Sequence, residues 1–135
     1  MIVSTKGRYA LRLMTALARR KESASLRELA AEENVPYKYT EAITSSLVKA
    51  GFVESTRGKN GGYTLTRAPG EYTLAEVLAV TETSLAATDC TGGKEAECPH
   101  AATCPTLPVW RALDETVSNF LSGYTLLDLM PGENQ

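Results

Sequence analysis

The sequence predicts a mainly α-helical protein with one small β-hairpin, and three observations support this fold class. Two capping patterns, Ser-x-x-Glu at residues 25–28 and Thr-x-x-Glu at 73–76, each precede an apolar stretch and indicate helix starts. Apolar residues recur at three- and four-residue spacing in the other predicted helices. Residues 52–66 instead hold two short β-prone segments around a loop with three glycines, which predicts a hairpin.

The composition excludes several classes of protein. The chain has 135 residues, of which 43% are hydrophobic and 22% charged, so we expect one folded domain, with or without an appended segment. No apolar run approaches the length of a membrane span, and the first residues lack the apolar core of a signal peptide. The three cysteines are an odd number, unlike a secreted disulfide framework. We therefore expect a cytoplasmic protein with reduced thiols and no membrane partner.

The net charge of −2 conceals an uneven distribution of charge along the chain. Residues 1–70 hold 12 Lys and Arg against 6 Asp and Glu, whereas residues 71–135 hold 2 against 10. A basic half joined to an acidic half is typical of a nucleic-acid-binding module with a separate tail. Chance clustering of solvated charge is the alternative.

The first predicted helix covers about residues 4–21 and begins at a Ser4 or Thr5 cap. Its first turns carry Lys6 and Arg8, although the dipole of a helix favours acidic residues at this end. These cations either form a solvated face or meet an external anion such as a DNA phosphate.

The next two predicted helices are joined by a tight connection. One runs from Ser25 to near Asn34, and the other covers about residues 36–50. Pro36 suits a first helical turn, and Gly51 suits the left-handed conformation that follows many helix ends. Two short helices with such a connection predict a helix-turn-helix.

A hairpin with a basic tip follows at once. We expect strands at residues 52–56 and 63–66, and the loop between them carries Arg57 and Lys59. The third helix is narrow enough for the major groove, and the hairpin can place a cation on the adjacent DNA backbone or in the minor groove. Residues 1–82 are therefore predicted to form a winged helix-turn-helix DNA-binding domain.

The remaining sequence divides into a cysteine loop and a long helix. Residues 83–104 have no clear period and hold all three cysteines and the single histidine, so we interpret them as a sensor loop. Residues 105–135 are predicted to form a dimerisation helix, to about 122, and a tail in which Thr125 caps a short helix. The helix packs either onto its own domain or, as we prefer, onto a second copy. The residues of this dimer seam are Val109, Trp110, Leu113, Val117, Phe120 and Leu121.

The start of the third helix holds the side chains best suited to read bases. Lys38 can meet a phosphate or a guanine, Thr40 a thymine methyl, and Glu41 the amino group of cytosine. Glu41 has a second interpretation, in which it only neutralises the helix start, and Tyr37 and Tyr39 either stack on the sugar–phosphate backbone or enter the core. The complete set of predicted DNA-binding residues is Lys6, Arg8, Tyr37, Lys38, Tyr39, Thr40, Glu41, Arg57, Lys59, Asn60 and Gly61.

Three segments carry a resemblance to a known family. These are Ser-Thr-Lys-Gly-Arg-Tyr-Ala at residues 4–10, Arg-Gly-Lys-Asn-Gly-Gly-Tyr at 57–63, and the cysteine cluster before Trp110. They resemble the Rrf-type bacterial transcription regulators, which include IscR-like, NsrR-like and CymR-like members. The resemblance implies a homodimeric winged helix that binds double-stranded operator DNA, usually as a repressor. It also implies that Arg57 contacts DNA from the wing and that Glu41 selects cytosine.

Many members of the family carry an iron–sulfur cluster on three cysteines before the dimerisation helix. The resemblance implies that Cys90, Cys98 and Cys104 hold a 2Fe-2S or 4Fe-4S cluster here. The residues alone leave three alternatives, namely small buried cysteines, a thiol–disulfide sensor, and a zinc site completed by His100.

The fourth ligand of such a cluster departs from the family pattern. IscR-like members place a histidine where this chain has Leu107, and some NsrR-like members place an acidic residue near the position of Arg8. Neither side chain present here can ligate iron. His100 is the first candidate for the fourth ligand, followed by Glu95, Glu97 and Asp89, and by a small ligand or solvent.

The sequence thus predicts a transcription regulator that senses iron–sulfur, redox or nitrosative state. The alternative is a cofactor-free winged-helix regulator controlled by a partner protein or by thiol oxidation. An enzyme with a cysteine nucleophile is not expected, because the one histidine has no evident orienting partner.

Overall fold

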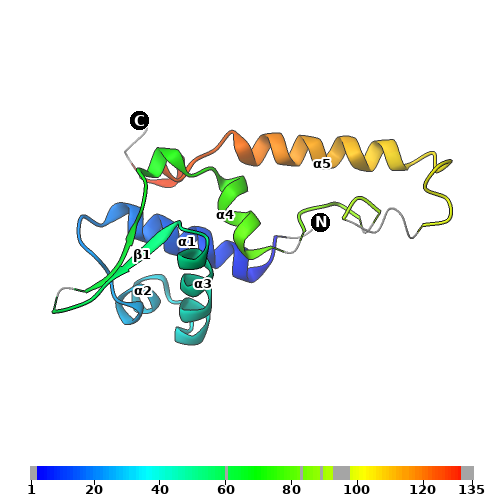
Figure 1. The fold of residues 1–135 in the computed structure, drawn as a ribbon. Coiled ribbons are helices and arrows are strands. Elements are labelled where there is room, and N and C mark those ends of the chain that lie inside the picture. The colour runs from blue at the N-terminus through cyan, green and yellow to red at the C-terminus, as the bar shows by residue number, and fades with distance from the viewer. Residues whose placement is uncertain (1–2, 60, 83, 89, 93–97, 132–135) are drawn as a thin grey trace.

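The computed structural model describes residues 3–59, 61–82, 84–88, 90–92 and 98–131. A helical head, formed by residues 3–82 except residue 60, carries a two-stranded hairpin. One long helix, α5 (Leu107–Ser122), runs across this head and projects beyond it (Figure 1). The elements in chain order are α1 (Thr5–Arg19), α2 (Leu26–Glu33), α3 (Tyr37–Lys49), β1 (Val53–Thr56), β2 (Gly62–Leu65), the 3₁₀ helix η1 (Pro69–Glu71), α4 (Leu74–Thr81), α5 (Leu107–Ser122) and the 3₁₀ helix η3 (Leu126–Leu129). The predicted mainly helical fold with a hairpin is confirmed.

Local capping sets most of the helix starts. The Ser4 hydroxyl accepts a hydrogen bond from the Gly7 amide at the start of α1, and Ser25 and Glu28 form the predicted capping box of α2. Asn34 ends α2 in the left-handed conformation, at a φ of 52°. Asparagine tolerates this region better than most residues, which allows the tight connection to α3.

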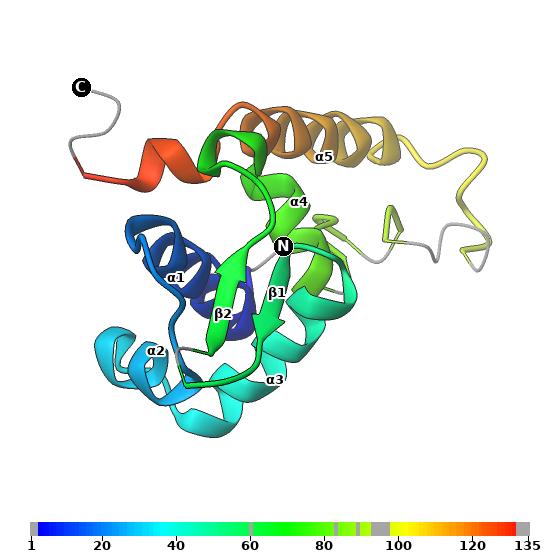
Figure 2. The ribbon, with the colours of Figure 1, turned by 60° about the vertical axis from the view of Figure 1, so that its left-hand side comes forward.

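The hairpin is anchored to the head by its own backbone. β1 and β2 are antiparallel, with Val53 opposite Leu65 and Thr56 opposite Gly62. Tyr63 also exchanges two backbone hydrogen bonds with Ala24, between α1 and α2. A Cβ on Gly62 would lie 2.7 Å from the Ala24 carbonyl oxygen, so this close approach requires glycine. The hairpin therefore leaves the helix-turn-helix at a fixed place (Figure 2).

One hydrophobic core joins the head to the end of the chain. Its large members are Leu13, Met14, Leu29, Ile43, Leu47, Val77 and Leu126. Leu126 reaches this core because the chain returns after α5, where the Leu126 amide bonds the Tyr72 carbonyl and the Leu74 amide bonds the Tyr124 carbonyl. Burial of each such side chain contributes about 1.5–3 kcal/mol.

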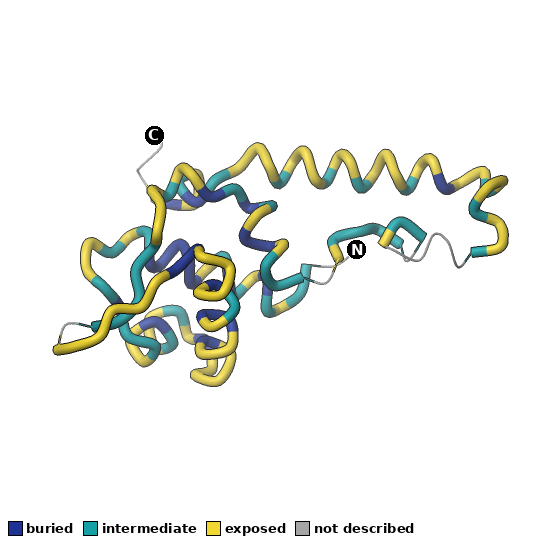
Figure 3. The backbone as a smooth tube through the Cα atoms, in the orientation of Figure 1, coloured by how far each residue is buried: buried dark blue, intermediate teal, exposed yellow. Residues whose placement is uncertain are grey.

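The long helix α5 is largely exposed. Among its described residues only Leu107, at its start, is buried, and most of its length is open to solvent (Figure 3). It packs against α4 over part of its length. In the part of the chain that the structure describes, no helix is long and apolar enough to cross a membrane.

Candidate nucleic-acid interface and cysteine cavity

The outward face of α3 is the most regular polar face of the head. The helix buries Ile43, Thr44 and Leu47 on one side. Its opposite side exposes a row of polar and charged side chains at three- and four-residue spacing, which is one helix face. The row consists of Lys38, Glu41, Ser45 and Lys49.

The structure corrects the prediction for Thr40. This side chain is fully buried, and its hydroxyl donates a hydrogen bond to the Pro36 carbonyl at 3.2 Å. Thr40 sits two positions after Lys38, which on a helix is the opposite side rather than the same one. A thymine methyl cannot reach it in this conformation, so Thr40 supports the helix rather than contacting DNA.

The two tyrosines at the start of α3 are about half exposed, at 46% for Tyr37 and 50% for Tyr39. Tyr39 packs edge-on against Tyr9 of α1, with ring centroids 5.9 Å apart, and the Arg12 guanidinium lies 5.8 Å from the Tyr9 ring centroid. This stack joins the start of α3 to α1. It leaves part of each Tyr37 and Tyr39 ring open to solvent.

The wing presents its cations to solvent. Arg57 and Lys59 are exposed, and Asn60 lies outside the described residues. The Gly61 amide donates to the Gly58 carbonyl at 3.0 Å, and a Cβ on Gly61 would lie 2.5 Å from the Thr56 carbonyl oxygen. Gly61 therefore has a clear structural task, which is to close the tip that carries the two cations.

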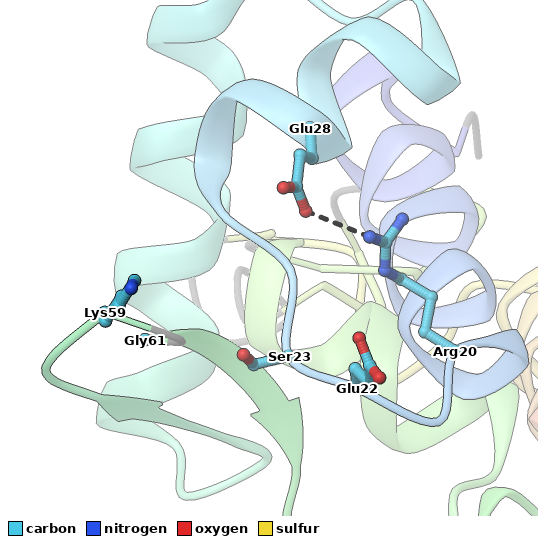
Figure 4. A pocket seen from close by; sticks show the side chains of 6 residues that line it. All are labelled: Arg20, Glu22, Ser23, Glu28, Lys59 and Gly61. Carbon is cyan, nitrogen blue, oxygen red and sulfur yellow. Dashed lines mark hydrogen bonds and ion pairs between the residues drawn. The ribbon is translucent and has the colours of Figure 1, made fainter.

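A polar pocket of about 510 Å³ opens between the wing tip and the α1–α2 connection. Figure 4 shows Lys59 and Gly61 on the wing side of this pocket and Arg20 with Glu28 across from them. Arg20 bonds Glu28 at 2.9 Å and Glu32 at 2.7 Å. This guanidinium is paired with α2, which leaves Lys59 as the lining cation nearest the wing tip.

A buried tyrosine fixes the base of the wing. The Tyr72 hydroxyl donates to the Phe52 carbonyl at 2.7 Å, and it accepts from the Thr66 and Arg67 amides at 3.0 Å each. Phe52 precedes β1, and Thr66 and Arg67 follow β2. One side chain therefore holds both strands together where they leave the head.

The start of α1 is also basic and accessible. Arg8 is exposed and Lys6 is half-buried. The Arg8 guanidinium donates to the Thr5 hydroxyl at 3.1 Å. Ser4 contacts a carboxylate that is distant in the sequence, because its amide and hydroxyl both donate to Glu82.

The three cysteines line one small cavity. Cys90, Cys98 and Cys104 are half-buried free thiols, and Ala101 and Leu107 complete the apolar lining. Three thiols facing one space are a donor set that suits an iron–sulfur cluster. In the described part of the chain, however, no three metal-ligating side chains stand close enough to hold a metal ion in this conformation.

The candidates for the fourth ligand are placed differently. His100 is exposed and does not line the cavity. Leu107 is 4% exposed and closes the cavity on the side of α5. Asp89, Glu95 and Glu97 lie outside the described residues.

Cys104 lies at the start of α5. Its thiol is 3.2 Å from the Thr106 hydroxyl. The hydrogen bond from this hydroxyl, with those of the Thr106 and Leu107 amides, lowers the pKa of Cys104 below its ordinary value. The Cys104 thiol should therefore ionise more readily than an ordinary cysteine.

The predicted dimer seam divides into two sets of side chains. Val117 and Leu121 are half-buried and line a pocket of about 380 Å³ together with residues of α4, residues 84–86 and Thr91. Trp110 is half-buried as well. The exposed set is Val109 (59%), Leu113 (40%) and Phe120 (61%), and Tyr124 (43%) extends it.

The comparisons with known proteins decide the family. The family model Rrf2, described as an iron-dependent transcriptional regulator, matches residues 3–132. The chain belongs to the Rrf2 family.

Relatives of this Rrf2 protein are regulators rather than enzymes. A protein of Neisseria meningitidis named as an HTH-type transcriptional regulator is 35% identical, covering 99% of this chain and 90% of its own. IscR of Vibrio atlanticus is 36% identical, covering 96% of this chain and 75% of its own.

Two solved structures have the same fold. IscR of T. potens has a TM-score of 0.77 and 30% identity, over 96% of this chain and 85% of its own. CymR of B. subtilis, described as the global cysteine regulator, has a TM-score of 0.76 and 32% identity, over 96% and 95%.

Several parts of this Rrf2 site were not predicted from the sequence. Ser45 and Lys49 extend the outward face of α3, and the spacing from Lys38 could have revealed them. Tyr72 and Glu82 act over distances of 20 and 78 residues, for which a single sequence carries no local signal.

Proposed function

We propose that this Rrf2 regulator binds operator DNA as a cytoplasmic homodimeric repressor, with α3 in the major groove and the wing on the flanking backbone or minor groove. The observation that carries the proposal is the outward face of α3, which is polar, regular and flanked by the exposed Arg57 and Lys59. A helix face of this kind beside a basic hairpin fits direct readout of bases together with phosphate contacts.

The proposed contacts divide into two groups. Lys38, Glu41 and Ser45 face outward and would meet base edges, where Glu41 selects cytosine by accepting from its amino group. The cations and tyrosines around them would hold the sugar–phosphate backbone and fix the register. This second group comprises Lys6, Arg8, Tyr37, Tyr39, Lys49, Arg57 and Lys59, with Asn60 and Gly61 at the wing tip.

Each of the three segments of the chain has its own proposed role. Residues 1–82 would read DNA, residues 83–104 would sense, and residues 105–135 would pair two subunits. The exposed apolar side chains of α5 support the last assignment, because a monomer would leave them in water.

For the sensor we propose an iron–sulfur cluster, 2Fe-2S or 4Fe-4S, held by Cys90, Cys98 and Cys104. The shared cavity of the three thiols and the relatives named IscR support this proposal. When bound, such a cluster responds to oxidants and to nitric oxide through its iron and sulfide. The chain's own contribution is to hold three thiolates between the head and α5, where a change of the loop biases their relative position.

The fourth ligand is proposed to come from the loop or from a small external molecule. His100 would have to turn inward from its exposed position, whereas Leu107 offers no donor. A thiol-based regulator is the second candidate function. The lowered pKa of Cys104 and the relative CymR favour it, and it would need either thiol oxidation or a partner protein.

The DNA-binding proposal is tested with duplexes that the wild-type protein selects from a randomised library. Arg57→Ala should weaken binding and lower the slope of log affinity against log salt by about 1, as expected when one phosphate is no longer neutralised. Arg111→Ala on α5 removes the same charge outside the proposed interface. Equal affinities for both variants would contradict the wing assignment.

The cluster proposal is tested by anaerobic purification followed by iron and sulfide assay and visible absorption. Stoichiometric iron and sulfide are expected in the wild-type protein, and their loss is expected in Cys98→Ser. Protein without iron or sulfide would instead support the thiol-based regulator.

A further inference from the structure

One carboxylate joins the end of α4 to the start of α1. Glu82 follows the last residue of α4, and its Oε1 atom accepts from the Ser4 amide at 2.9 Å and from the Ser4 hydroxyl at 2.6 Å. Ser4 is in turn the cap of α1, because its hydroxyl accepts from the Gly7 amide at 3.0 Å. Glu82 thus extends the cap of a helix whose capping residue, Ser4, lies 78 positions earlier in the chain.

The negative charge of Glu82 lies at the positive, N-terminal end of α1. The first turn of this helix has no acidic residue and instead carries Lys6 and Arg8. The positive end of the helix dipole and these cations together favour a nearby anion. The sequence alone left these cations either on a solvated face or against an external anion, and the structure places the Glu82 carboxylate at the N-terminal end of α1.

Gly7 leaves the space that this carboxylate occupies. A Cβ on Gly7 would overlap Glu82 Oε1 and would lie 3.0 Å from Leu78 Cδ2. Gly7 is fully helical and has no conformational requirement for glycine. Glycine within a helix is ordinarily unfavourable relative to alanine, so the space for Glu82 explains its presence here.

Glu82 connects the segment before the cysteine loop to the start of α1. Glu82 ends the head, and Cys90 of the cysteine cavity follows eight positions later. Its partner Ser4 lies two positions before Lys6 and four before Arg8, both of which we assign to DNA phosphates. We propose that Glu82 is a positioning residue that couples the cysteine loop to the phosphate-contacting start of α1. This inference rests on the proposed DNA-binding function.

Removal of this carboxylate has opposite effects under two accounts. By net charge alone, Glu82→Ala should strengthen DNA binding, because it removes a negative charge. As a positioning residue, its loss should weaken binding and lower the salt slope by about 0.9 for each phosphate that α1 no longer neutralises. Glu115→Gln on α5 removes the same charge at an exposed site outside the interface. The probe is a duplex that the wild-type protein selects from a random library.

A second pair of variants tests the contact itself. Gly7→Ala should reproduce the weaker binding with no change of charge, because the new methyl displaces the Glu82 carboxylate. In the Glu82→Ala background, Gly7→Ala should cost little or nothing more, since the overlap is gone. Additive losses in the double variant would show that the two residues act independently and would overturn the proposal.

The coupling to the cysteine loop needs its own readout, taken on the metal-free, reduced protein. DNA should slow the alkylation of the cysteines several-fold in the wild-type protein and in Glu115→Gln. It should leave the rate unchanged in Glu82→Ala at a DNA concentration that saturates this variant. An identical slowing in all three proteins, or none in the wild type, would overturn the coupling. A wild-type protein that selects no DNA would instead refute the proposed function.

Discussion

Glu41 is an unusual residue for a surface that we propose faces DNA, because a carboxylate repels phosphates. It is exposed on the outward face of α3 beside Lys38, away from the side of the helix that packs into the head. A carboxylate gains at such a place only where it accepts a hydrogen bond from a base amino group, which in the major groove is that of cytosine or adenine. Its value is therefore selection among sequences rather than overall affinity.

The substitution Glu41→Ala should relax the preference at one base pair of each half-site. The selected base should lose about 1–3 kcal/mol of its advantage over the others, while affinity for unselected duplexes rises because a negative charge is gone. Competition binding with single-base variants of the selected duplex measures this. Glu115→Ala, which removes a charge from α5, serves as the control, and an unaltered base preference in Glu41→Ala would refute the assignment.

Cys104 should be a reactive thiol in the metal-free protein. Its pKa is lowered by the hydrogen bond with Thr106 and by the amides at the start of α5, so its thiolate forms at lower pH than that of an ordinary cysteine. The alkylation rate should accordingly rise with pH and level off at a lower pH than it does for a cysteine with an ordinary pKa. The measurement uses a Cys90→Ser, Cys98→Ser background.

The cause of that shift can be tested in the same background. Thr106→Val removes the largest contribution and should move the midpoint of the rate profile to higher pH. Thr103→Val changes an exposed threonine in the same segment and should leave the midpoint where it is. Equal midpoints in all three proteins would show that Thr106 does not set the pKa.

At the scale of elements, the wing depends on a side chain outside it. The Tyr72 ring is fully buried and packs edge-on against Phe52, with centroids 5.5 Å apart, while Arg67 stacks on both rings. Its hydroxyl bonds the backbone on both sides of the hairpin. The direction in which the wing carries Arg57 is therefore set by a residue that never meets DNA.

Tyr72→Phe should keep the packing and lose these hydrogen bonds. The Arg67 amide loses its partner in this partly buried place, so the free energy of unfolding should fall by about 1–3 kcal/mol. Urea unfolding measures the change. Tyr37→Phe, at a tyrosine that is 46% exposed, should change stability by less than about 0.5 kcal/mol. A Tyr72→Phe protein as stable as the wild type would refute the role of this hydroxyl.

The elements themselves were largely predictable, because their signals are local. The capping boxes at Ser25 and Thr73 marked the starts of α2 and α4, and the glycines of the wing marked the hairpin. For the proposed site, the exposure of the residues was predictable only where they follow a local period. Thr40 was assigned to DNA because it adjoins Lys38 and Glu41 in the chain, although its direction on the helix places it in the core.

At the scale of the whole molecule, the basic and acidic halves of the chain correspond to different structural parts. The basic half contains the helix-turn-helix and the wing, and the acidic half contains α4, the cysteine loop and α5. Acidic residues repel DNA from the projecting helix, so docking through the opposite face is favoured. That helix is then free for a different partner, and its exposed side chains include a row of large apolar ones.

We expect Phe120→Asp to convert the proposed dimer into monomers. Phe120 is 61% exposed, its ring lies 5.0 Å from that of Tyr124, and it shares the exposed apolar face of α5 with Val109 and Leu113. A charge buried in a subunit interface costs several kcal/mol, which exceeds what the remaining contacts can offset. Sedimentation analysis should then give half the wild-type mass.

Asn119, next to Phe120, provides a matched control for the test of the proposed dimer. Asn119→Asp adds the same charge one residue earlier, on an exposed side of α5 that points away from the apolar face. It should leave the dimer intact and DNA affinity nearly unchanged. Phe120→Asp should also weaken binding to duplexes with two half-sites far more than to those with one, because a monomer has a single reading head and cannot bind both half-sites at once. A dimeric Phe120→Asp protein would place the subunit interface elsewhere.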